Sequence, residues 1–147
     1  MSIEIIDGHK AIIGKGEKAA REILEILFPN RWIAVQRKAM EFYSANVLKE
    51  GLSERQEKET IDIAILPART FEKLDIKKAV IVRVQGQEHA GFHKQITDKR
   101  QRQDLEQSGA RVVDLWYYEC PTLFKDVVNY RSFLEVCSAL LAAGVPP

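Results

Sequence analysis

The chain has 147 residues, of which 46% are hydrophobic and 29% are charged, and its formal net charge is +1. This composition is ordinary for one globular domain spanning residues 1–147, and two cysteines are too few for a disulfide framework. No apolar run approaches the roughly 18 residues of a membrane-spanning helix. The start MSIEIIDGHK lacks the features of a signal peptide, so we expect a cytoplasmic protein without a membrane partner. Because the net charge is small, binding to nucleic acid would need a local basic patch.

The first half of the chain contains one clear helix and one short strand. Apolar residues spaced as on one helical face predict a helix over 17–28, which a Pro-Asn pair ends. Residues 32–35 are β-branched and aromatic, which predicts a strand. Residues 39–48 fit a strand or a helix equally well. The polar, charged stretch 49–58 is typical of an exposed loop.

The second half alternates between strands and helices. Two apolar segments, 60–66 and 78–84, predict strands, and the second is nearly free of polar residues, as a central strand is. A charged helix is predicted over 91–108, with Gly109 as its C-cap. A strand over 110–116 and an amphipathic helix over 130–143 follow.

The predicted order is helix, strand, strand, strand, helix, strand, helix. A helical crossover between the last two strands implies that they run parallel, whereas strands joined without a helix pair antiparallel more often. The sequence therefore predicts an α/β fold with a mixed central sheet flanked by helices.

Two charged residues interrupt the apolar strands, and each needs a physical explanation. Asp62 lies inside the segment TIDIAIL, where a buried and unpaired carboxylate would cost several kcal/mol. Arg83 lies late in the next strand and could be its partner. One interpretation is an Asp62–Arg83 ion pair at the sheet edge, and the other is a metal-binding or catalytic site at the end of the sheet.

Further candidate site residues follow the strand 78–84. Gly86 allows a tight exit from the strand, and His89 comes three residues later, where it could be a general acid or base, a metal ligand or a surface residue. In the next helix, Lys94, Asp98 and Arg102 share one face at intervals of four residues. That face is either a solvated surface or a phosphate-binding surface.

This ordered set of features resembles the PD-(D/E)xK superfamily of restriction-endonuclease-like nucleases. The closest similarity is to very-short-patch-repair endonucleases and the small restriction-like proteins related to them. In those proteins the first helix carries a glutamate and a strand carries an aspartate. The next strand has an acidic residue, then an apolar residue, and then aspartate, lysine or glutamine. A glycine, a histidine, a helix with spaced Asp and Arg, and a strand ending in an aromatic residue follow. The matching residues here are Glu17, Asp62, Arg83 to Gly86, His89, Asp98, Arg100, Arg102, Leu105, Gly109 and the segment VVDLW.

The resemblance implies a metal-dependent DNA endonuclease acting in repair, restriction or branched-DNA cleavage. Asp62 and Glu17 would hold Mg²⁺ or Mn²⁺, and Gln85 and His89 would complete the catalytic set by orienting water or phosphate. Such domains often form two-fold dimers on DNA; the helix 130–143 could serve as an interface, although core packing explains its apolar residues as well. The residues implied to contact DNA are Arg83, Lys94, Arg100 and Arg102.

One position departs from the pattern of the family. Arg83 stands where a second metal-binding acid is expected, and its guanidinium would repel the ion and cannot deprotonate. Gln85, in the usual lysine position, is a smaller departure.

Three hypotheses follow from this departure. In the first, another acid supplies the missing ligand and the protein cuts DNA; the candidates are Glu17, Glu59, Glu88 and Asp98. In the second, Arg83 itself fills the metal position, paired with Asp62 and Glu17, and the protein is a silent module that binds nucleic acid or a protein partner. In the third, the chain is an unrelated α/β protein with a structural Asp62–Arg83 pair.

Overall fold

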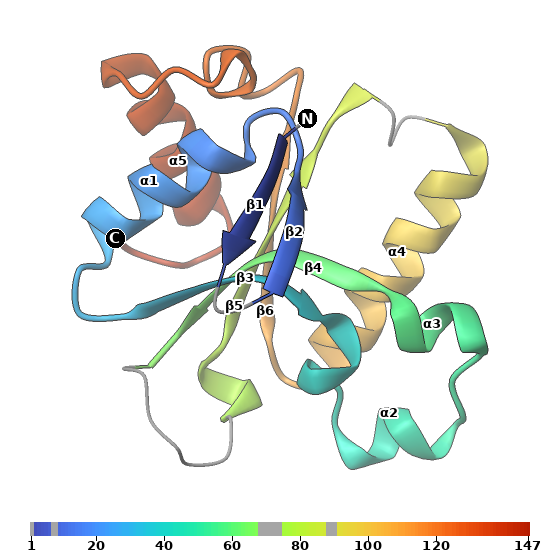
Figure 1. The fold of residues 1–147 in the computed structure, drawn as a ribbon. Coiled ribbons are helices and arrows are strands. Elements are labelled where there is room, and N and C mark those ends of the chain that lie inside the picture. Colours follow the sequence, from blue (N-terminus) through green and yellow to red (C-terminus); the bar gives the residue numbers. More distant parts are fainter. Residues whose placement is uncertain (1, 7–8, 68–74, 88–90) are drawn as a thin grey trace.

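A four-stranded mixed sheet forms the centre of the computed structural model, which describes residues 2–6, 9–67, 75–87 and 91–147 (Figure 1). The strand order is β3 (Trp32–Lys38), β4 (Thr60–Leu66), β5 (Val80–Gln85) and β6 (Arg111–Trp116). The first three strands pair antiparallel, and β5 pairs parallel with β6. The predicted α/β class and mixed sheet are therefore confirmed.

Helices cover both faces of this sheet (Figure 1). Helices α1 (Glu17–Leu27) and α5 (Tyr130–Ala142) pack on one face, and α4 (Phe92–Gln107), which connects β5 to β6, packs on the other. Short helices α2 (Ala45–Lys49) and α3 (Glu54–Lys58) precede β4. Across the part of the chain that the structure describes, no helix is long and apolar enough to cross a bilayer.

The two faces of the sheet bury two separate apolar cores. The core under α1 and α5 contains Ile23, Val82 and Leu115, all at most 2% exposed. The core under α4 contains Phe42 and Leu105, both fully buried. Since β5 contributes to both cores, it is a central strand, as its nearly continuous apolar sequence predicts.

Among the described residues, the predicted element order omits two strands and two short α-helices. Strands β1 (Ser2–Ile6) and β2 (His9–Ile13) pair antiparallel as a separate hairpin, and the Asp-Gly between them in the sequence is a hairpin signal that the prediction did not use. Helix α2 lies mostly in the ambiguous segment, and α3 lies in the predicted loop. Helix α3 begins with a capping box, because Ser53 and Gln56 exchange side chain-to-backbone hydrogen bonds of 3.2 and 2.7 Å.

A second capping box fixes the start of α5. Asn129 Oδ1 accepts a bond of 3.0 Å from the Ser132 N–H, and Ser132 Oγ accepts one of 2.9 Å from the Asn129 N–H. We expect Asn129→Ala to lower the free energy of unfolding by about 1 kcal/mol, measured by urea denaturation. Ser53→Ala is the control: α3 buries no residue, so it can fray locally, and the global change should stay below about 0.5 kcal/mol. Equal losses in both variants would contradict this difference.

Candidate functional site

Glu17 and Asp62, the two implied metal ligands, are brought into contact. Glu17 is the first residue of α1, Asp62 lies in β4, and the Asp62 side chain acts on Glu17 through both its charge and a hydrogen bond. Gln36 Nε2 donates a hydrogen bond of 2.9 Å to Glu17 Oε2, and the Val84 N–H donates one of 2.7 Å to Asp62 Oδ2. The carboxyl pair is thus held by β3 and β5 as well as by its own elements.

The local fold around this pair departs from regular sheet geometry. The pairing of β4 with β5 ends at Ile63 and Val82, so the Asp62 carboxylate takes the Val84 N–H in place of a strand carbonyl. Gln36 has a left-handed φ of 51° inside β3, a conformation that costs energy for a residue with a side chain and is often found at functional sites. A Cβ at Gly14 would lie 2.8 Å from Glu17 Oε1, so glycine there leaves room for the carboxylate.

The pKa of Glu17 is raised from 4.5 to about 7. Burial is the largest cause and the negative charge of Asp62 is the second, while hydrogen bonds from Gln36 and Gly14 act in the opposite direction. Two adjacent carboxylates do not both ionise readily without a cation, so a bound cation would relieve this repulsion.

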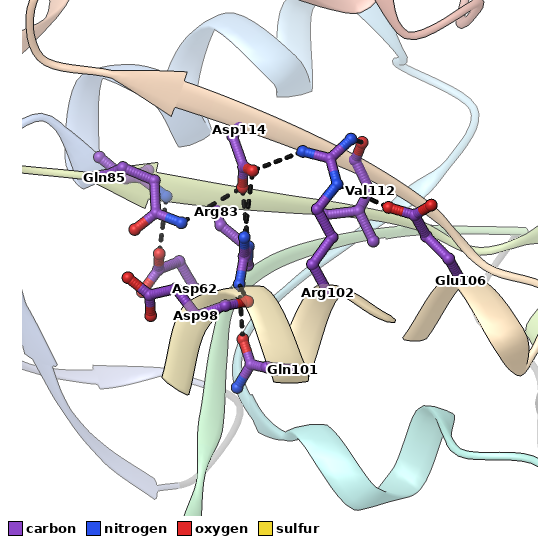
Figure 2. A network of polar contacts seen from close by, with 10 residues as sticks. Asp62, Arg83, Gln85, Asp98, Gln101, Arg102, Glu106, Val112 and Asp114 are labelled. Carbon is purple, nitrogen blue, oxygen red and sulfur yellow. Dashed lines mark hydrogen bonds and ion pairs between the residues drawn. The ribbon is translucent and has the colours of Figure 1, made fainter. Parts of the chain in front are cut away.

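The hydrogen-bond partners of Arg83 lie on β6 and α4 (Figure 2). Its Nε and one terminal nitrogen donate to both oxygens of Asp114 at 2.7 and 3.0 Å, and the other terminal nitrogen donates to the Asp98 carbonyl at 2.7 Å and to Gln101 at 3.3 Å. Arg83 therefore forms its ion pair with Asp114, and the interpretation that paired it with Asp62 is wrong. The parallel register sets Arg83 beside Asp114, and this pairing directs the guanidinium there.

Asp114 is the centre of this buried group. It also accepts hydrogen bonds from Arg102 at 2.6 Å and from Gln85 at 3.3 Å, and its side chain is only 7% exposed. Burial alone would raise the pKa of Asp114, but the hydrogen bonds and charges of Arg83 and Arg102 outweigh burial and lower it. Arg83 is thus used inside the protein, and it does not replace a metal ion between Glu17 and Asp62.

A cleft of about 420 Å³ lies beside Asp62. Asp62, Asp98 and Gln85 line it together with four basic side chains, Arg55, Lys58, Arg83 and Lys94. The structure therefore brings Lys94 to the same cleft as the predicted acid, and Lys94 is exposed.

The other basic residues implied to contact DNA have acidic partners. Arg100 pairs with Glu59 at 2.6 Å and Asp104 at 3.0 Å, and Arg102 pairs with Glu106 at 2.6 Å besides Asp114. These bonds raise the pKa of both guanidinium groups although burial opposes the shift. The carboxylate of Glu59 is therefore ion-paired with Arg100.

The alternative acids differ in where the structure places them. Glu17 touches Asp62, and Asp98 lines the same cleft, whereas Glu88 and the predicted site residue His89 lie outside the described residues. Within the described residues, no three His, Cys, Asp or Glu side chains are grouped so that they could hold a metal ion. In the part of the chain that the structure describes, the acids in contact at this site are Glu17 and Asp62.

Two residues that the sequence analysis overlooked complete this region, Gln36 and Asp114. Asp114 gives the same signal as Asp62, a charged residue inside an apolar strand, in VVDLW. Gln36 comes directly after the segment 32–35 that was predicted as a strand. Its left-handed backbone conformation cannot be predicted from the residue type.

Comparisons of the chain with protein-family models, with curated proteins and with solved structures found no match. The α/β fold and the geometry of the site are therefore the basis for a proposal about function.

Proposed function

We propose that the protein is a metal-dependent DNA endonuclease built on a restriction-endonuclease-like core. The observation that carries the proposal is the contact between Glu17 and Asp62 at the point where β4 and β5 separate. Glu17 is buried beside Asp62 and its pKa is raised, and groups with shifted pKa values of this kind gather at functional sites. The sequence pattern and the mixed sheet support the same proposal.

The carboxyl pair fits a small divalent cation. Mg²⁺ and Mn²⁺ prefer oxygen ligands and are commonly held by one or two carboxylates, with water completing the coordination. A bound ion would supply charge stabilisation to the phosphate being cleaved. Glu17 and Asp62 would hold it, Gln36 would orient Glu17, and the Val84 N–H would orient Asp62.

The cleft beside the pair suits a phosphate backbone. Lys94, Lys58 and Arg55 line it, and the cation of Arg83 at its wall is already neutralised by Asp114. Phosphate contacts from such side chains supply most of the affinity for DNA without reading its sequence. Lys94 is accordingly the proposed DNA contact that this cleft supports best.

A silent nucleic-acid-binding module is the second candidate, and one observation favours it. Among the described residues, the carboxyl pair has no third acid, and the position expected to provide one carries Arg83. Such a module would use the same cationic cleft for binding without cleavage.

Cleavage assays separate the two candidates. The protein is incubated with supercoiled plasmid and with a synthetic four-way junction in Mg²⁺, Mn²⁺ or EDTA. We expect metal-dependent cutting that falls about 100-fold or more in Asp62→Asn and in Glu17→Gln, since losing even an outer partner of a metal ligand costs about 10- to 100-fold. Glu22→Gln is the matched control, because Glu22 is exposed on the same helix.

The remaining outcomes have distinct meanings. Metal-independent binding without cutting, weakened by Lys94→Ala and with a salt dependence reduced by about one phosphate contact, would establish the silent module. Cutting that is unchanged in Asp62→Asn would contradict the proposed site. Absence of both binding and cutting would contradict both candidates.

A further inference from the structure

Three aromatic residues in succession follow the buried part of β6. The rings of Trp116 and Tyr118 stack with centroids 5.7 Å apart and planes 26° from parallel, and Tyr117 meets Tyr118 edge-on at 5.3 Å. Tyr118 is 64% exposed, although it lies over two other rings. The stack therefore presents aromatic surface to solvent.

A cleft of about 480 Å³ separates these rings from α4. Its lining combines the three aromatic residues with the polar side of α4, including Lys99 and Arg102. Arg83 and Asp98 line both this cleft and the cleft beside Asp62, so the two clefts adjoin along one wall. A ligand that extends past Arg83 and Asp98 could therefore contact both clefts.

The charges in the aromatic cleft differ in how far they are engaged. Arg102 bonds Asp114 and Glu106, each at 2.6 Å, and its charge is largely offset. Lys99 is exposed beside it on α4. The cleft thus combines a flat aromatic wall with a cation at its rim, which are the two elements that grooves for single-stranded nucleic acid share.

We propose that the Trp116–Tyr118 stack is a platform for an unpaired base of single-stranded DNA, with Lys99 on the neighbouring phosphate. The inference rests on the proposed function, because it takes DNA as the ligand of the adjoining acid cleft. Each nucleobase has a π-face, so the platform accepts any base and selects for strands in which a base is free to stack. The substrate class that follows is DNA with single-stranded character, such as a branch, flap or bubble.

The test measures binding in EDTA, where no cleavage occurs. In a Trp32→Phe background, Trp116 is the sole tryptophan of the chain, and we expect its emission to be quenched by a strand of about 15 thymidines. An abasic strand of equal length carries the same phosphates and should bind at least about fivefold more weakly. Tyr118→Ala should weaken binding of the thymidine strand about tenfold, and Tyr118→Phe should restore it.

The control is Tyr130→Ala, because Tyr130 is 77% exposed on α5 and does not line this cleft. It should bind like the parent. Equal binding of the thymidine and abasic strands, or unchanged binding in Tyr118→Ala, would overturn the platform and leave the nuclease proposal standing. Base-dependent binding in a protein that cuts no DNA would support the platform while the nuclease proposal fails. Binding to no strand would overturn the platform.

Discussion

Asp114→Asn is expected to lower the free energy of unfolding by about 3–5 kcal/mol. The change removes the charge that neutralises Arg83, whose side chain is only 6% exposed, and Arg83 cannot lose its proton to avoid the cost. It also leaves Arg102 without its shorter link to β6. Urea denaturation monitored by circular dichroism measures the loss.

An exposed pair with the same geometry provides the control. Arg37 binds both oxygens of Glu41 at 3.0 and 2.9 Å, but these side chains are 30% and 36% exposed. Because water screens this pair, Glu41→Gln should cost less than about 1 kcal/mol. Similar losses in Asp114→Asn and Glu41→Gln would contradict the role assigned to burial.

Replacing Arg83, the ion-pair partner of Asp114, should lower the free energy of unfolding by less than Asp114→Asn does. Arg83→Met leaves Asp114 with its bonds to Arg102 and Gln85, and a carboxylate can also take up a proton. The double variant Arg83→Met/Asp114→Leu removes both buried charges and should recover much of the loss, as happens when apolar residues replace buried ion pairs. This ordering identifies Arg83 as a structural residue of the fold.

The fold was largely predictable because its central strands and long helices carry strong periodicity. The segments 60–66 and 110–116 are apolar enough to specify strands by themselves, and the helix between β5 and β6 implies their parallel pairing. Helix α3 could not be predicted in this way, because it buries nothing and depends on the capping box of Ser53 and Gln56. Its signal is local hydrogen bonding, which a search for apolar periodicity does not detect.

The site was predictable only in part, because residue types identify a charged group but not its partner. Asp62 and Glu17 were predicted as metal ligands, and the structure brings their side chains together. One of the two interpretations paired Arg83 with Asp62, since the two occupy successive strands, whereas the register of β5 against β6 places it beside Asp114. Whether Arg83 pairs with Asp62 or with Asp114 depends on where β4 and β5 separate, and that point is set by tertiary structure.

The second large effect is a loss of stability as the pH rises, caused by Glu17. Its pKa is about 7 in the folded protein against an ordinary 4.5, so between these values the folded state holds a proton that the unfolded state has lost. The stability due to this proton is fully present below pH 4.5 and is lost as the pH rises through about 7. A shift of this size corresponds to about 3 kcal/mol.

Glu17→Gln isolates this contribution, because glutamine imitates the neutral carboxyl group. In EDTA, the variant and the parent should be similarly stable near pH 4.5, and the variant should be more stable by about 3 kcal/mol at about pH 8. Taking the difference at each pH cancels the titrations that the two proteins share. Glu22→Gln, on the exposed side of the same helix, is the matched control for replacing a glutamate of α1 by glutamine.

Magnesium then separates the titration from the metal site. If Glu17 and Asp62 hold Mg²⁺, the ion stabilises the ionised pair, so it should raise the stability of the parent at about pH 8 and leave Glu17→Gln nearly unchanged. A difference between the proteins that grows with pH in EDTA but does not respond to Mg²⁺ would confirm the raised pKa of Glu17 and reject the carboxyl pair as a metal site. A difference independent of pH would show that burial and the charge of Asp62 do not raise the pKa of Glu17 in solution, which would contradict the buried carboxyl site on which the nuclease proposal rests.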